Sequence, residues 1–128
     1  MKTETSAVNV AKAHIEAWSN HDWDTSRNLL AEDVRVEVST TQPIMAPVDT
    51  TGVDAYMQGL HTFAGPIVTG SAKILSAIGD GQTAMVLVSV KTDIPGQGQV
   101  DLHGARLYAL DEAGRIAHEK VIFFVTRP

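Results

Sequence analysis

Arg106 and Glu119 are the residues of this 128-residue sequence whose types and spacing could do chemistry. Each stands in a stretch of alternating apolar and polar residues, and the segment 111–114 (DEAG) between the stretches is typical of a tight turn. If Leu110 pairs with Arg115 across that turn, Arg106 lies opposite Glu119. Both side chains then share one face of the hairpin, because successive strand residues alternate between faces. The pattern therefore predicts an arginine–carboxylate pair, for which bidentate hydrogen bonding is natural.

The surroundings of this pair decide its role, and three interpretations stay open. On the same face, the predicted neighbours are Leu102, Gly104, Tyr108, Val121 and Phe123. In such apolar surroundings two charges must pair with each other or bind something. They form either a structural salt bridge that closes the hairpin, or a pair that orients a ligand through a carbonyl, enolate or carboxylate oxygen on Arg106. In the third interpretation both side chains point to solvent.

His14 is the third candidate for chemistry, because histidine changes charge near neutral pH and suits a proton shuttle. It lies at the border of an apolar stripe with helical spacing, formed by Val8, Ala11, Ile15 and Trp18. A lone histidine in such a place is more often a hydrogen-bonded core or surface residue than a catalyst. His14 becomes a catalytic candidate only if the fold brings it into one cavity with Arg106 or Glu119.

Several classes of site are excluded or disfavoured by what the sequence lacks. It has no cysteine, which excludes disulfides, thiolate zinc sites, iron–sulfur clusters and a cysteine nucleophile. Its five histidines show no HxH or HExxH spacing, so we predict no metal site. It contains no P-loop, no GxGxxG after a strand and no GxSxG motif, and we therefore expect no cofactor.

Charge and hydropathy restrict the partners and the location that we expect. The net charge is −5 and the basic residues are scattered singly, which argues against nucleic acid. The longest apolar runs, 84–88 and 121–125, are far too short to cross a bilayer. The first six residues lack the apolar region of a signal peptide. These features predict a cytoplasmic protein with no membrane partner.

Helical patterns come first along the chain and strand patterns follow, which is typical of an α+β domain. The predicted helices cover 6–19, a short stretch capped by Asp22, and the segment between Gly52 and the Gly65-Pro66 pair. Strands are predicted from Val34 onwards, with a loop over 39–51, and then at 67–78, 82–94, 100–110 and 115–126. The length favours one domain over 1–128.

The predicted sheet is apolar on both faces. In its central strand Val86 and Val88 alternate with Met85 and Leu87, and the last strand shows a similar pattern. Helices can cover only one of the two faces, and large exposed apolar patches are rare on monomers. We therefore expect a homodimer through the outer sheet face, with long loops or helix ends as the alternative cover.

Three stretches, taken with the element order, give the chain a known layout: AHIEAWSNHDWDTSRNLLAEDVRVEV at 13–38, TGVDAYMQGL at 51–60 and LYALDEAGRIAHEKVIFF at 107–124. This layout resembles the nuclear-transport-factor-2-like superfamily, which includes the SnoaL-like polyketide cyclases and the ketosteroid isomerases. The resemblance covers nearly the whole chain and is specific for fold rather than activity. It implies a cone-shaped α+β barrel, in which three N-terminal helices pack on a curved antiparallel or mixed sheet and enclose a pocket for a small apolar molecule.

The resemblance also implies which residues line that pocket. His14, Arg106 and Glu119 are then the candidate catalytic groups. The implied ligand-binding residues are Trp18, Val38, Tyr56, Leu60, Gly104, Tyr108, Val121 and Phe123.

The chemistry of these families does not transfer residue by residue. The ketosteroid isomerases place a tyrosine donor, an aspartate base and a protonated aspartate where this sequence has His14, Val38 and Arg106. The limonene-epoxide hydrolases use an Asp–Arg–Asp arrangement, of which Arg106 and Glu119 offer an arginine and one carboxylate. Glu119 is also a loose match to the acidic residue of the SnoaL-like cyclases. Steroid isomerisation by the family mechanism is therefore not expected.

Three functions follow, and the sequence leaves open whether the protein is an enzyme. A cofactor-independent cyclase, isomerase or hydratase acting on a small carbonyl or polyketide-like compound would move a proton with Glu119 or His14. Arg106 would stabilise the oxyanion. The absent family catalytic residues favour instead a non-catalytic module that binds a hydrophobic ligand. The third function is a dimeric accessory protein whose outer sheet face is the working surface.

Overall fold

The structure is a computed structural model that describes residues 7–40 and 48–125, except for the side chains of 40 and 123–125. Its elements in chain order are α1 (Ala7–Ser19), α2 (Trp23–Asn28), β1 (Leu30–Thr40), β2 (Val48–Thr51), α3 (Val53–Ala64), β3 (Lys73–Gly79), β4 (Thr83–Ile94), β5 (Gly98–Leu110) and β6 (Ile116–Val125). No helix within the described residues has the length and apolar character needed to cross a membrane.

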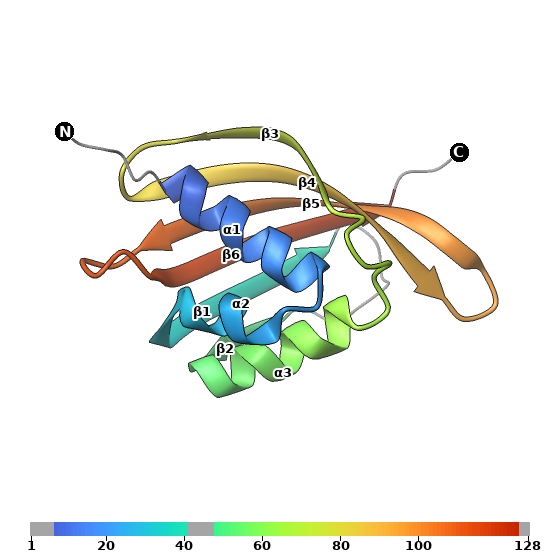
Figure 1. Ribbon diagram of the computed structural model, residues 1–128, viewed down its shortest axis with the longest axis horizontal. Helices are drawn as coiled ribbons and strands as arrows, with labels where there is room; N and C mark the ends of the chain where they lie inside the picture. Colours follow the sequence, from blue (N-terminus) through green and yellow to red (C-terminus); the bar gives the residue numbers. More distant parts are fainter. Residues whose placement is uncertain (1–6, 41–47, 126–128) are drawn as a thin grey trace.

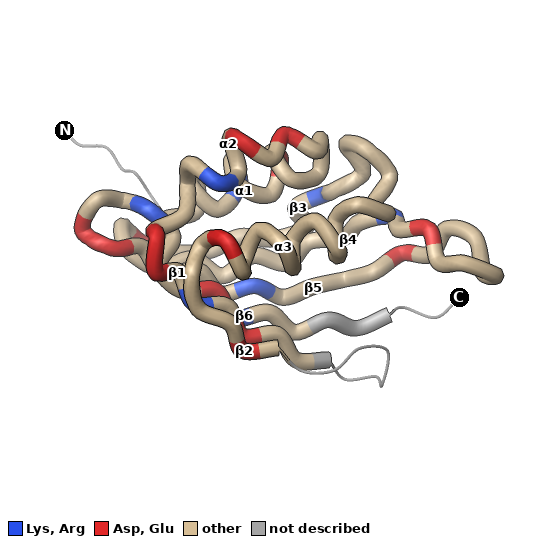
Figure 2. The backbone as a smooth tube through the Cα atoms, turned by 90° about the horizontal axis from the view of Figure 1, so that it is seen from below, with Lys and Arg blue, Asp and Glu red and all other residues tan. Residues whose placement is uncertain are grey.

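The strands form one six-stranded sheet in the order β2-β1-β6-β5-β4-β3. Neighbouring strands are antiparallel except β1 and β6, which run parallel and close the first strand onto the last. In Figure 1 the three helices lie over one face of the sheet, and β4 and β5 curve around α1. Figure 2 shows α1 and α2 lying together on that side. The predicted α+β fold, with three helices on a curved mixed sheet, is confirmed.

The helices form where the sequence places apolar residues on one face and capping residues at the ends. In α1, Ala11, Ile15 and Trp18 recur every three or four residues and are fully buried. The carboxylate of Asp22 caps α2 by accepting a hydrogen bond from the Thr25 amide at 3.3 Å. Gly52 precedes α3 with φ of 106°, a conformation that side chains disfavour. Apolar faces and capping residues therefore define where each helix lies and which side of it packs on the sheet.

The prediction of a loop over 39–51 is wrong at both ends. β1 continues to Thr40, and Val48–Thr51 forms β2, which pairs antiparallel with β1 so that Arg35 lies opposite Thr51. A four-residue strand beside prolines carries too little alternation to stand out from a loop. The strand predicted over 67–78 is also too long, because β3 begins at Lys73 and Ile67 forms only an isolated bridge to Thr92.

The predicted register of the last hairpin is wrong by two residues. Leu110 pairs with Ile116 rather than Arg115, because the Asp111 carboxylate accepts hydrogen bonds from the amides of 113 and 115 and keeps Arg115 in the turn. A bulge at Ala117 adds a second shift. Arg106 therefore lies opposite Val121, and Glu119 lies opposite Tyr108. Two shifts of one residue restore the strand period, so Arg106 and Glu119 still share a face.

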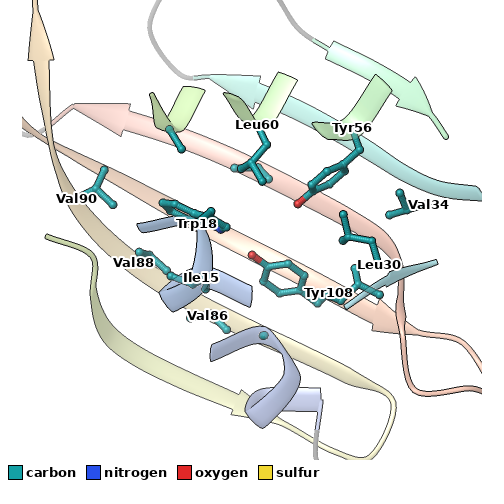
Figure 3. Packing of buried hydrophobic residues seen from close by; sticks show 14 of the residues in the cluster. Ile15, Trp18, Leu30, Val34, Tyr56, Leu60, Val86, Val88, Val90 and Tyr108 are labelled. Atoms are coloured by element: carbon teal, nitrogen blue, oxygen red, sulfur yellow. The ribbon is translucent and has the colours of Figure 1, made fainter. Parts of the chain in front are cut away.

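The two faces of the sheet have different environments. Val86, Val88 and Val90 are buried against the helices, where Figure 3 shows them packed near Ile15 and Trp18. The opposite face exposes large apolar side chains of β3, β4, β5 and β6, with exposed fractions of 37 to 67%: Ile78, Met85, Leu107 and Ile122. The helices thus cover one apolar face and leave a second apolar face in solvent.

Candidate functional site

A cavity of about 120 Å³ lies between α3 and the sheet strands β1, β2, β5 and β6. Most of its wall is aliphatic or aromatic, and its polar groups are Thr50, Tyr56, Arg106 and Glu119. Its remaining lining residues are Val36, Val38, Val48, Ala55, Gly59, Leu60, Phe63 and Val121. An apolar wall with a few convergent polar groups is the usual composition of a small-molecule site. The volume suits a small ligand, below the size of most drug-like compounds.

Arg106 and Glu119 form an ion pair at this cavity. Arg106 Nη1 lies 2.9 Å from Glu119 Oε2, and the side chains are only 5% and 1% exposed. The two residues are diagonal neighbours on β5 and β6, since Arg106 lies opposite Val121 and Glu119 opposite Tyr108. The interpretation in which both charges point to solvent is therefore wrong.

Aromatic rings hold the Arg106 guanidinium in place. Its central carbon lies 5.0 Å from the centre of the Trp18 ring and 5.4 Å from the centre of the Phe63 ring. The two rings meet edge to face, with centroids 5.5 Å apart. Both contacts are within the range of cation–π attraction, which is strongest where water is excluded. α1 and α3 together thus fix the direction of a charged group that belongs to the sheet.

A chain of hydrogen bonds approaches Glu119 from the helices. Tyr56 donates its hydroxyl proton to Glu119 Oε1. His14 Nε2 lies 2.8 Å from the Tyr56 oxygen, and His14 Nδ1 lies 2.9 Å from Ser26 Oγ. A phenol has one O–H, and Tyr56 uses it to donate a hydrogen bond to the carboxylate. The Tyr56 oxygen must therefore accept from a protonated Nε2 of His14, and the unprotonated Nδ1 must accept from the Ser26 hydroxyl. All four residues are buried, and Figure 3 shows the Tyr56 and Tyr108 hydroxyls directed towards the same region.

Burial and neighbouring charges determine the protonation states of these groups. Burial lowers the pKa of His14 to about 4, so its imidazole is neutral at neutral pH. Burial also raises the pKa of the Tyr56 phenol well above its usual value, with the nearby Glu119 charge adding to the effect. For Glu119, burial favours the neutral acid, but the Arg106 charge and the hydrogen bond from Tyr56 outweigh it and lower the pKa. The site therefore contains one anion and one cation, with every other member neutral.

The structure places the predicted site residues in two groups. Six of them line the cavity: Val38, Tyr56, Leu60, Arg106, Glu119 and Val121. Four are buried but do not line it: His14, Trp18, Gly104 and Tyr108. Of these four, Trp18 packs on Arg106, and His14 reaches Glu119 only through Tyr56. The side chain of Phe123 lies outside the described residues.

Ser26 is not predicted from the sequence, and neither are six residues of the cavity wall: Val36, Val48, Thr50, Ala55, Gly59 and Phe63. Phe63 shares the helical face of Tyr56 and Leu60, so its position in α3 was a usable signal. Val48 and Thr50 depend on a short strand where the sequence pattern predicts a loop. Ser26 gave no signal at all, because a serine among polar residues of a short helix is ordinary in sequence and its burial depends on packing.

Metal binding finds no support in the described part of the chain, where no group of three potential ligands comes together. His103 lies opposite Phe124 and His118 opposite Ala109, so the two outer-face histidines are separated along β5 and β6. His118 Nε2 instead lies 2.6 Å from Glu37 Oε2 on β1. The polar groups of the cavity are thus one ion pair, a phenol and a threonine hydroxyl.

Comparisons with known proteins agree with this architecture. The sequence profile of the SnoaL-like domain matches residues 11–119. No curated protein matches the sequence. The stretches at 13–38 and 51–60, and the stretch from 107 as far as Glu119, thus fall within a profile of the expected family.

Solved structures share the fold over nearly the whole chain. A protein from Kribbella flavida is 26% identical, with a TM-score of 0.76 over 94% of this chain and 88% of that one. A candidate ketosteroid isomerase from the same organism is 20% identical, with a TM-score of 0.74 over 95% and 80%. A Mycobacterium tuberculosis protein, solved in complex with estradiol-17β-hemisuccinate, is 14% identical, with a TM-score of 0.75 over 91% and 93%.

Proposed function

Since this chain belongs to the SnoaL-like domain family, we propose that it is a cofactor-independent enzyme of the cyclase, isomerase or hydratase kind. Its substrate would be a small, mostly apolar carbonyl compound bound between α3 and the sheet. One observation carries the proposal: an ionised carboxylate and a guanidinium are paired, almost fully buried, in the wall of an apolar cavity. A structurally similar protein binds a steroid ester, which supports an apolar ligand in this fold.

The energetic cost of the pair favours a role beyond stability. Burying two charges costs several kcal/mol per ion, and an apolar pair of the same volume often stabilises a fold as well or better. Arg106 and Glu119 are also both in contact with the cavity, whereas a purely structural pair needs no access to a ligand. Ionisable groups held in fixed geometry in a cleft are typical of functional sites.

In the proposed reaction Glu119 is the base and Arg106 supports the developing negative charge. A Glu119 oxygen accepts the proton from the carbon next to the carbonyl, and the electrons of that C–H bond form the double bond of an enolate. The charge that moves to the carbonyl oxygen lies beside the Arg106 guanidinium. When the substrate carries a C=C bond next to the deprotonated carbon, the enolate is a dienolate, and Glu119 returns the proton to its far carbon, which completes an isomerisation without gain or loss of atoms.

Deuterium exchange tests this proposal without knowledge of the natural substrate. Proton NMR in D₂O is expected to show loss of the α-proton signal of small ketones, starting with cyclohexanone, faster with the protein than in buffer. Glu119→Gln is expected to slow this exchange by about 100-fold or more, since general bases contribute that much. Asp101→Asn, on the exposed surface of β5, is the matched control and should exchange at the wild-type rate. Absence of exchange with every ketone, or equal rates in Glu119→Gln, contradicts the proposal.

A non-catalytic ligand carrier is the second candidate, and one observation favours it. Both Glu119 oxygens already accept hydrogen bonds inside the protein, from Tyr56 and from Arg106, and such bonds weaken a carboxylate as a base. Native mass spectrometry is expected, for a carrier, to find a copurified small molecule that is lost from a cavity-filling Val38→Trp variant. Exchange or turnover of any ketone by the wild type would reject the purely passive role.

We also propose that two copies associate through the exposed apolar face of the sheet. Ile78, Met85 and Leu107 form one continuous row across β3, β4 and β5, because Met85 pairs with both of the others. Leu87, Ala105 and Ile122 form a second row beside it, across β4, β5 and β6. A contiguous exposed patch of this kind is typical of a protein–protein interface.

Sedimentation velocity tests the dimer. Wild-type protein is expected to sediment as a dimer, and Met85→Glu or Leu107→Glu is expected to shift it to the monomer, because an unpaired charge would be buried at the interface. Gln58→Glu adds the same charge on the exposed side of α3 and should leave the dimer intact. A monomeric wild type at tens of micromolar protein contradicts the proposal.

A further inference from the structure

We propose that His14 and Ser26 are positioning residues. They keep the Tyr56 O–H directed at Glu119 as a hydrogen-bond donor, and this bond keeps the carboxylate ionised and its orientation fixed in the cavity wall. This inference rests on the proposed function of Glu119. It gives a role to two buried polar residues that lie outside the cavity wall, with His14 hydrogen-bonded to both Tyr56 and Ser26.

The first support is the direction of the hydrogen bonds. Glu119 accepts from Tyr56, so Tyr56 must accept from His14, and neutral His14 must then accept from Ser26. Each member of the chain can donate once and accept, and the carboxylate at its end can only accept. The ionised state of Glu119 and the Nε2–H tautomer of His14 therefore depend on each other.

The second support is the construction of α2. This helix has six residues, and Ser26 is the one that is buried. Its hydroxyl points to His14 on α1, while Asp22 caps the helix and Arg27 forms an exposed ion pair with Asp54 of α3. α2 thus brings a single hydroxyl donor to the imidazole nitrogen that faces away from the cavity.

The third support is the set of groups that face Glu119 from each surrounding element. His14 on α1, Tyr56 on α3, and Arg106 and Tyr108 on β5 all act on its charge. Arg106 is already held between two aromatic rings, and Tyr108 belongs to the neighbouring strand. Tyr56 is the donor that comes from a helix, and without His14 its hydroxyl could turn towards a bound ligand. With His14 in place, the Tyr56 O–H donates to Glu119 and is not free for a ligand. Arg106 then remains as the donor for a ligand oxygen.

NMR of labelled protein tests this inference without any ligand. Nitrogen-15 spectra of the His14 imidazole in wild-type protein at pH 7 are expected to show Nε2 protonated and Nδ1 bare. Carbon-13 titration of the Glu119 carboxyl is expected to give a pKa that rises by about one to two pH units in Tyr56→Phe, which removes one hydrogen bond to a charged group. Ser26→Ala is expected to mix the two His14 tautomers and to raise the Glu119 pKa in the same direction by a smaller amount.

Ser19→Ala is the matched control for Ser26→Ala. Ser19 is also a buried helical serine, but its hydroxyl accepts from the Ala72 amide and lies outside the chain. The control is expected to keep the wild-type tautomer and titration. The inference is overturned if wild-type Nδ1 carries the proton, or if Ser26→Ala matches Ser19→Ala in both measurements. The wild-type tautomer needs no variant, and failure of ketone exchange leaves these NMR results unaffected, so the two proposals fail separately.

Discussion

Glu119→Ala is expected to lower the free energy of unfolding by about 3–5 kcal/mol, because it leaves the Arg106 guanidinium buried without its counterion. The side chain of Arg106 is only 5% exposed, so its charge loses its counterion in a place that bulk solvent hardly reaches. Urea denaturation at pH 7 measures the loss. Asp101→Ala is the control, since its ion pair with Lys91 spans the neighbouring strands with both side chains 53% exposed. That substitution should cost less than about 1 kcal/mol.

The double variant Arg106→Met with Glu119→Leu separates a structural pair from a functional one. Two apolar side chains remove both buried charges, and such replacements are often neutral or stabilising. We expect the double variant to regain most of the stability lost in Glu119→Ala and to lose ketone exchange completely. A double variant that is as unstable as the single one would favour the salt bridge as a structural element. A stable double variant that still exchanged α-protons would remove the pair from the proposed chemistry.

The face shared by Arg106 and Glu119 could be predicted from sequence even though their exact register could not. Strand alternation survives any even shift, so the wrong pairing with a bulge and a longer turn still put both side chains inside. The hydrogen bonds of the Asp111 carboxylate that keep Arg115 in the turn, and the separate bulge at Ala117, have no mark in the sequence pattern. Patterns of period two and 3.6 likewise gave the helices and the long strands.

Contacts between distant elements could not be predicted in the same way. The family resemblance implies Tyr56 at the cavity, but its hydrogen bond to His14 joins residues 42 positions apart and depends on the packing of α1 against α3. Ser26 reaches His14 only because α2 folds back on α1. The sequence therefore supplied the ion pair as a candidate, and tertiary packing supplied the chain that supports it.

Acidification from pH 6.5 to 4 is expected to lower the free energy of unfolding by about 3 kcal/mol through His14 alone. In the native state burial lowers the pKa of His14 to about 4, whereas the unfolded chain has the ordinary value of 6.5. Between these two values the unfolded state binds a proton that the native state excludes, so stability falls as pH falls, by about 1.4 kcal/mol per pH unit. Glu119 acts in the same direction at lower pH, because its native pKa lies below 4.5.

His14→Gln isolates this contribution. A glutamine amide can donate to the Tyr56 oxygen and accept from Ser26, as the neutral imidazole does, but it has no proton to gain in this range. Urea denaturation between pH 4 and 7 should therefore show a steep decline for the wild type and a much flatter curve for His14→Gln. Parallel curves would mean that the imidazole charges in the native state at ordinary pH. The directed chain would then be broken, because a charged His14 donates from both nitrogens and Ser26 can no longer be its donor.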